Sequence, residues 1–212
     1  MPAGTQLSHF LSPYVRRCHT PRATLMVNDR ETIKMKGKHM NAATERMTEV
    51  LRALDWNFEV DEASEMINAG CKGDNGQWRI KLGGLNDFTV AILSRFPIDC
   101  PEAKRSVCAE LLTRINFMML VGCFEMDYDD GCIFYKTTVP YDGELPQHEL
   151  LNKLLSLNLS TMDRYLPAIM SVIYARTSPA KALADLAKAE KRAKQTKAAK
   201  PKLAAKPRFQ MN

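Results

Sequence analysis

Four acidic side chains between two strand-like segments are the strongest candidate for metal chemistry in the chain. Glu125, Asp127, Asp129 and Asp130 lie close together, and closely spaced carboxylates are typical of calcium loops. An EF-hand loop that began at Glu125 would need Gly at its sixth position and Glu at its twelfth, but Asp130 and Lys136 stand there. We therefore predict a solvated hairpin turn and no metal site.

Zinc and phosphate sites lack the spacing that they need. Cys18, His19 and His9 have no second ligand pair for a tetrahedral zinc, and none of the six cysteines forms a CxxC pair. The segment from Gly70 to Gly73 has the GxxG spacing of a KH loop, but it precedes a strand hairpin instead of joining two helices. No P-loop or GxGxxG motif is present. We expect no cofactor.

Catalysis by a serine or cysteine would need a base beside it. His148 is the only histidine between residues 40 and 180, and no motif surrounds it. We predict no catalytic residue, and free, buried or half-buried thiols for the cysteines of the core. An enzyme whose unfamiliar site gathers His148 with carboxylates in a deep pocket is the least favoured alternative.

The basic residues are concentrated at the two ends. Residues 1–39 carry seven Lys and Arg against two acids, residues 181–212 carry ten against two, and residues 40–180 carry 13 against 20. A pI near 9.0 usually suggests nucleic acid, but here the central segment, which we expect to fold, is acidic. The end segments are either solubilising appendages or weak, salt-sensitive contacts to a polyanion. The candidate polyanion contacts are Lys191, Arg192, Lys194, Lys197, Lys200 and Lys202.

We predict three parts: a disordered basic extension at 1–39, an α+β domain at 40–180, and a short helix followed by a disordered Lys/Ala/Pro-rich tail at 181–212. The extension is rich in Arg and poor in acids, as mitochondrial transit peptides are, but it lacks their amphipathic helix. Met40 is an alternative start to Met1. Since the chain has neither a secretory signal nor an apolar run of about 18 residues, we expect a cytoplasmic protein.

Hydrophobic periodicity predicts a helix and three strands in the first half of the domain. Apolar residues recur at helical spacing from Met47 to Leu54. Strands are expected at about 58–69, 77–82 and 88–92. The Gly73-Asp74-Asn75-Gly76 cluster and the Gly83-Gly84 pair provide the turns, because Gly and Asn accept positive φ cheaply.

The second half opens with a helix after Pro101, whose buried stripe includes Met118 or Met119. A hairpin follows, with Asp130-Gly131 as a two-residue turn. This turn would pair Met126 with Tyr135 and Glu125 with Lys136, and it would place Tyr128 on the apolar face.

A long helix is expected from about Pro146, and it should kink or restart at Pro167. A last helix should begin at Ser178-Pro179, and disorder should follow Ala189. The order α-β-β-β-α-β-β-α indicates an α+β fold with an antiparallel sheet of about five strands.

Two stretches, LVGCFEMDYDDGCIFYKTTVP at 120–140 and STMDRYLPAIMSVIYA at 160–175, resemble the YbjN family of bacterial regulators of sensory transduction. The most family-like run extends from Met162 to Pro167. The preceding elements also follow the family's order, so the resemblance spans most of the central domain.

The resemblance implies a fold similar to type III secretion chaperones, often dimeric, that binds other proteins and is not an enzyme. Asp163, Arg164 and Tyr165 are then candidate partner contacts, although a structural role for Asp163 and Arg164 is the stronger interpretation. We hypothesise a non-enzymatic protein-binding module with a regulatory or chaperone-like role, acting through an apolar patch or a sheet edge. The alternative is a nucleic-acid-associated accessory factor whose basic ends act as electrostatic tethers.

Overall fold

The computed structural model describes residues 40–198, which form four helices and six strands. The helices are α1 (Ala42–Ala53), α2 (Glu102–Asn116), α3 (His148–Tyr174) and α4 (Pro179–Ala198). The strands are β1 (Phe58–Asp61), β2 (Met66–Lys72), β3 (Gln77–Asn86), β4 (Thr89–Arg95), β5 (Cys123–Met126) and β6 (Ile133–Pro140). None of the described helices is long and apolar enough to cross a membrane.

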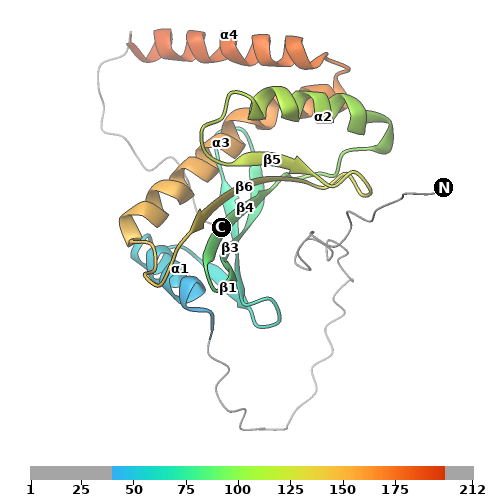
Figure 1. The fold of residues 1–212 in the computed structure, drawn as a ribbon. Helices are drawn as coiled ribbons and strands as arrows, with labels where there is room; N and C mark the ends of the chain where they lie inside the picture. The colour runs from blue at the N-terminus through green and yellow to red at the C-terminus, as the bar shows by residue number, and fades with distance from the viewer. Residues whose placement is uncertain (1–39, 199–212) are drawn as a thin grey trace, which may run out of the picture. The chain divides into compact units, whose positions relative to one another are not determined.

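The strands form one antiparallel sheet in the order β1-β2-β3-β4-β6-β5 (Figure 1). Alternate residues of each inner strand are buried, as in Trp78, Ile80 and Leu82 of β3, and they share a core cluster with α1 and α3. The apolar face of the sheet is thus covered by the protein's own helices. On the opposite face, Arg79 is exposed and Lys81 is half-buried.

The predicted α+β class with an antiparallel sheet is confirmed, but the sheet has six strands where the sequence predicted about five. The additional strand arises because the region from Phe58 to Ala69 is not continuous. The Asp61 carboxylate accepts hydrogen bonds from the backbone N–H groups of Ala63 and Ser64. The chain reverses there, through Glu65 at a φ of 54°.

The β5–β6 hairpin has a register two residues away from the predicted one. Phe124 pairs with Tyr135 and Met126 pairs with Ile133, so the connection is longer than the predicted turn at Asp130-Gly131. Within it, the Asp130 carboxylate accepts from the Cys132 N–H at 2.7 Å. Because a two-residue shift keeps every side chain on its face, Phe124 and Tyr135 remain in the core, whereas Tyr128 is exposed and not on the apolar face as predicted.

The last two helices are longer than the pattern suggested. α3 continues through Pro167 without the predicted restart, and α4 extends beyond Ala189, where disorder was predicted, to Ala198. The first half of α4 packs on the core through Ala182, Leu183 and Leu186. A core fragment that ends at residue 180 would therefore lose apolar contacts. The predicted extension at 1–39 and the tail beyond residue 198 lie outside the described residues.

A buried polar chain connects the sheet to α3. The Trp78 indole Nε1 donates to Ser94 Oγ at 3.0 Å, and Ser94 Oγ donates to Asn158 Oδ1 at 2.5 Å. The Asn158 amide nitrogen lies within 3.2 Å of the carbonyl oxygens of Ile92 and Tyr135 and is also 3.2 Å from Thr137 Oγ1. Since both Asn158 and Ser94 are fully buried, these bonds hold α3 in one position over β4 and β6.

Candidate protein-interaction surface

The most family-like run, Met162 to Pro167, meets the β2–β3 turn in space, although Asp163 and Asn75 are 88 residues apart in the sequence. Asp163 Oδ1 accepts from the Asn75 N–H at 2.8 Å, and the Asn75 side chain donates to the Asp163 carbonyl oxygen at 3.0 Å. That carbonyl would normally accept from the residue four positions later, but Pro167 has no N–H. Asn75 therefore replaces the missing helical donor, and α3 tolerates its proline.

The glycine at the start of this turn is required by close approach. A Cβ on Gly73 would lie 2.2 Å from Asp163 Oδ1, whereas none of the four turn residues has a positive φ. The predicted reason for the glycines, positive φ, is therefore wrong at this turn. Asp163 is fully buried, and its hydrogen bonds connect α3 to the β2–β3 hairpin.

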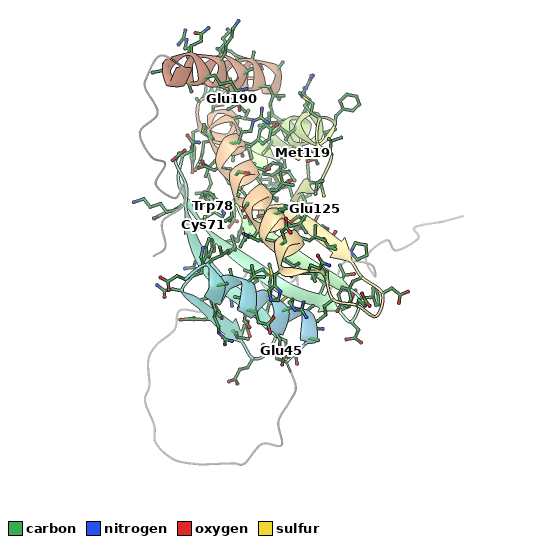
Figure 2. All side chains as sticks on the ribbon, turned by 90° about the vertical axis from the view of Figure 1, so that its left-hand side faces the viewer. Glu45, Cys71, Trp78, Met119, Glu125 and Glu190 are labelled. Atoms are coloured by element: carbon green, nitrogen blue, oxygen red, sulfur yellow. The ribbon has the colours of Figure 1, made fainter. Side chains whose placement is uncertain are left out.

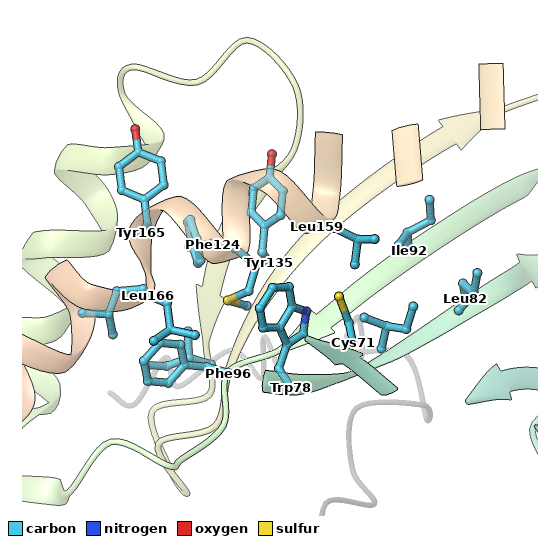
Figure 3. Close-up of a cluster of buried hydrophobic side chains, with 14 of the residues drawn as sticks. Cys71, Trp78, Leu82, Ile92, Phe96, Phe124, Tyr135, Leu159, Tyr165 and Leu166 are labelled. Carbon is cyan, nitrogen blue, oxygen red and sulfur yellow. The ribbon is translucent and has the colours of Figure 1, made fainter. Parts of the chain in front are cut away.

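The neighbouring residues of the motif also hold elements together. Arg164 donates two hydrogen bonds to the Glu190 carboxylate of α4, from Nε at 2.5 Å and from Nη2 at 2.9 Å. Its guanidinium lies 5.0 Å from the centre of the Tyr165 ring. Tyr165 itself is only 6% exposed and packs edge-on against Phe124, 5.9 Å between ring centres (Figure 3). Of the three candidate partner contacts, only Arg164 is at the surface.

The core thiols are reduced and shielded. Burial raises the pKa of Cys71 and of Cys108 to about 12, so both are protonated at neutral pH. We expect iodoacetamide to modify these two residues only after denaturation, because the thiolate is the reactive form. Peptide mass spectrometry of native and denatured samples measures this difference. Labelling of native Cys108 as fast as in denaturant would contradict the packing described here. The free cysteines of the described residues are Cys71, Cys100, Cys108, Cys123 and Cys132, as predicted.

The acidic hairpin and the lone histidine have ordinary surface roles. The Asp127 carboxylate accepts from the Asp129 N–H at 2.9 Å, which stabilises the turn. His148 Nε2 lies 2.8 Å from Glu49 Oε2, and both side chains are about half exposed. Between residues 40 and 198, no group of three or more His, Cys, Asp or Glu is arranged to hold a metal ion.

The segment from Phe117 to Val121, here called the 117–121 loop, is the most exposed apolar feature of the described chain. It connects α2 to β5. Phe117 is 91% exposed, Met118 73% and Leu120 101%. Of its side chains, Met119 packs inward against the core. Monomeric proteins seldom leave large neighbouring apolar side chains in water unless another molecule covers them.

The 117–121 loop is fixed at both ends. The Asn116 side chain accepts from the Phe124 N–H and donates to the Phe124 carbonyl, both at 2.8 Å. The Tyr135 hydroxyl donates to the Val121 carbonyl at 2.7 Å. Gly122, at a φ of 74°, allows this contact, because a Cβ there would lie 2.7 Å from the Tyr135 hydroxyl. The loop thus presents its side chains in a preorganised conformation.

The same asparagine blocks part of the sheet edge. β5 is an edge strand, and an incoming strand would need the outward N–H and C=O groups of Phe124. Asn116 already occupies both groups. The sequence suggested two surfaces for a partner, an apolar patch and a sheet edge. At β5 the sheet edge is partly blocked, whereas the apolar side chains of the 117–121 loop are exposed.

The sequence pattern left open which methionine of this surface is buried. Met118 and Met119 were alternatives for the buried stripe of the helix after Pro101; α2 ends at Asn116, Met119 packs against the core and Met118 faces solvent. The signal available in the sequence is the absence of any charged residue between Arg114 and Glu125. Such a run fits a buried strand equally well, so the sequence alone could not reveal the exposed loop.

The basic candidates lie partly on α4. Lys191, Arg192 and Lys194 are exposed on its second half. Lys197 is on the last turn of the helix, but its side chain is outside the described part of the structure. Lys200 and Lys202 also lie outside the described residues.

Comparison with known proteins gives one family. The family model "YbjN: Putative bacterial sensory transduction regulator" matches residues 43–170. The chain is also similar to the crystal structure of YbjN from E. coli, with 14% sequence identity and a TM-score of 0.42, over 61% of this chain and 87% of that one. None of the curated proteins compared with the chain is a match.

Proposed function

The chain belongs to the YbjN family, which is described as a family of bacterial sensory transduction regulators, and from this premise we propose that it is a non-enzymatic protein-binding module with a regulatory or chaperone-like role. The observation that carries the proposal is the 117–121 loop. Its side chains at Phe117, Met118 and Leu120 are almost fully exposed, and its backbone is held at both ends.

The physical driving force is burial of these side chains by a partner. Covering a large apolar side chain contributes roughly 1.5–3 kcal/mol, and a loop that is already ordered loses little entropy on binding. Large apolar side chains that protrude in this way are typical anchors of protein interfaces. The free thiols of the described residues support the proposed cytoplasmic setting.

We expect Leu120→Asp in the full-length protein to weaken partner capture about tenfold or more, because a charge would have to be desolvated at the centre of the contact. The measurement is quantitative pull-down from a nuclease-treated lysate. Phe88→Asp is the matched control, since Phe88 is also exposed, at 61%, but lies at the β3–β4 turn. Equal capture by wild type and Leu120→Asp would refute the proposed surface.

The second candidate is a nucleic-acid-associated factor, and the exposed Lys191, Arg192 and Lys194 of α4 are the observation that favours it. Its test is sensitivity of the captured material to nuclease and salt. Both tests need α4 in place, because Glu190 pairs with Arg164 and Ala182 is buried.

A further inference from the structure

Three acidic side chains of α2, β5 and α4 are paired with basic ones. Glu110 Oε1 lies 2.8 Å from Arg114 Nε on α2, and Glu125 Oε1 lies 2.5 Å from Lys136 Nζ on the hairpin. Glu190 of α4 is held by Arg164. These carboxylates therefore add little negative potential.

A chain of direct contacts connects this loop to α4, which also packs against α2, the helix that precedes the loop. Phe124, whose backbone is bonded to Asn116 at the start of the loop, packs against Tyr165. Tyr165 lies under Arg164, and Arg164 binds Glu190. In Figure 2, Met119 and Glu190 lie toward one end of the molecule, with Glu45 at the other.

Three bases follow Glu190 directly along α4. Lys191, Arg192 and Lys194 are exposed and form no ion pair with any residue between 40 and 198. The sequence beyond Ala198 adds four more bases and no acid. The helix that packs against α2 thus carries positive charge that no described carboxylate neutralises.

We propose that the partner segment is acidic as well as apolar. Its large apolar side chains cover Phe117, Met118 and Leu120, and its carboxylates meet Lys191, Arg192 and Lys194. This inference rests on the proposed protein-binding function and specifies the chemistry of the partner. An anionic lipid surface would also combine apolar and acidic groups, and the vesicle arm of the test distinguishes it from an acidic protein segment.

The test uses three synthetic amphipathic helical peptides and the full-length protein, with binding followed by fluorescence anisotropy. The first peptide has Leu and Phe on one face and Glu on the other, the second has Lys in place of Glu, and the third has Ser in place of Leu and Phe. We expect the first to bind about tenfold more tightly than either of the others. Equal binding of the Lys peptide or of the Ser peptide would overturn the inference.

Charge reversal separates this inference from the proposed function. The triple variant Lys191→Glu, Arg192→Glu, Lys194→Glu should lose about tenfold in affinity for the first peptide. The control Lys72→Glu, Arg79→Glu, Lys153→Glu has the same change in net charge at three exposed sites elsewhere and should bind as wild type does.

If Leu120→Asp weakens peptide binding but the α4 triple variant does not, the loop is a protein-binding surface, and only the inference that α4 recognises acidic groups of the partner is wrong. If Leu120→Asp binds as wild type does, both proposals fail. A third arm uses vesicles of phosphatidylcholine with phosphatidylglycerol. Loop-dependent binding to these vesicles, with no binding to the first peptide, would show a membrane surface as the partner and overturn the inference.

Discussion

Replacing Asn158 with Leu should lower the free energy of unfolding by about 4 kcal/mol, because several buried polar groups would lose their partner at once. Asn158 is fully buried and bonds Ser94, Thr137 and two strand carbonyl groups. Leucine has a similar volume, so the loss comes mainly from unsatisfied hydrogen bonds and not from a cavity. Urea denaturation followed by circular dichroism measures it.

The matched control is Asn152→Leu. Asn152 is on the same helix but is exposed, so the change should stay within about 0.5 kcal/mol. A combined Ser94→Ala, Asn158→Leu variant should recover little of the loss, since it removes one orphaned hydroxyl but leaves the Trp78 indole N–H without its acceptor. If Asn158→Leu were no less stable than Asn152→Leu, the polar chain would not be what holds α3 on the sheet.

Gly131→Ala should destabilise the fold by about 3 kcal/mol or more, because it combines an unfavourable backbone conformation with a steric clash. Gly131 has a φ of 81°. A Cβ there would lie 2.1 Å from the carbonyl oxygen of Cys100, which is backbone and cannot rotate away. The hydrogen bond from Cys100 N–H to the Gly131 carbonyl, 2.7 Å long, would be strained by any displacement.

Gly143→Ala isolates the backbone part of this effect. Gly143 has a φ of 73°, and a Cβ there would meet no atom within 4 Å. Its substitution should therefore cost only about 1 kcal/mol, the ordinary penalty of a left-handed alanine. If denaturant titrations gave equal losses of unfolding free energy for Gly131→Ala and Gly143→Ala, the Cys100 carbonyl would not be in tight steric contact with Gly131.

The elements with strong periodicity could be predicted from the sequence. The apolar stripe of α1 is an example, with Met47 and Leu51 fully buried as the spacing indicated. The alternation in β3 likewise placed Trp78, Ile80 and Leu82 on the core face. In both cases a local pattern is sufficient, because burial follows directly from the period of the element.

Features that depend on contacts between distant segments could not be predicted. Asn158 looks like any polar helical residue until Ser94 and Thr137 are placed beside it. Asp163 and Asn75 acquire their roles only when the β2–β3 turn reaches α3.

The same limit applies to the proposed site. Whether Met118 is buried or exposed depends on where α2 ends, and the ends of helices are the least certain part of a pattern. The amide of Asn116, bonded to Phe124, fixes the chain as it leaves the helix and turns Met118 outward.

Site-specific photo-crosslinking tests the central claim most directly, since it reports what touches the 117–121 loop. The full-length protein would carry a benzophenone side chain at position 118 or, as the control, at position 88. Both positions are exposed in this structure. We predict discrete protein adducts from position 118 that are absent from position 88 and lost in the Leu120→Asp background. The same adducts from both positions, or none from position 118, would contradict the assignment of this loop as the protein-binding surface.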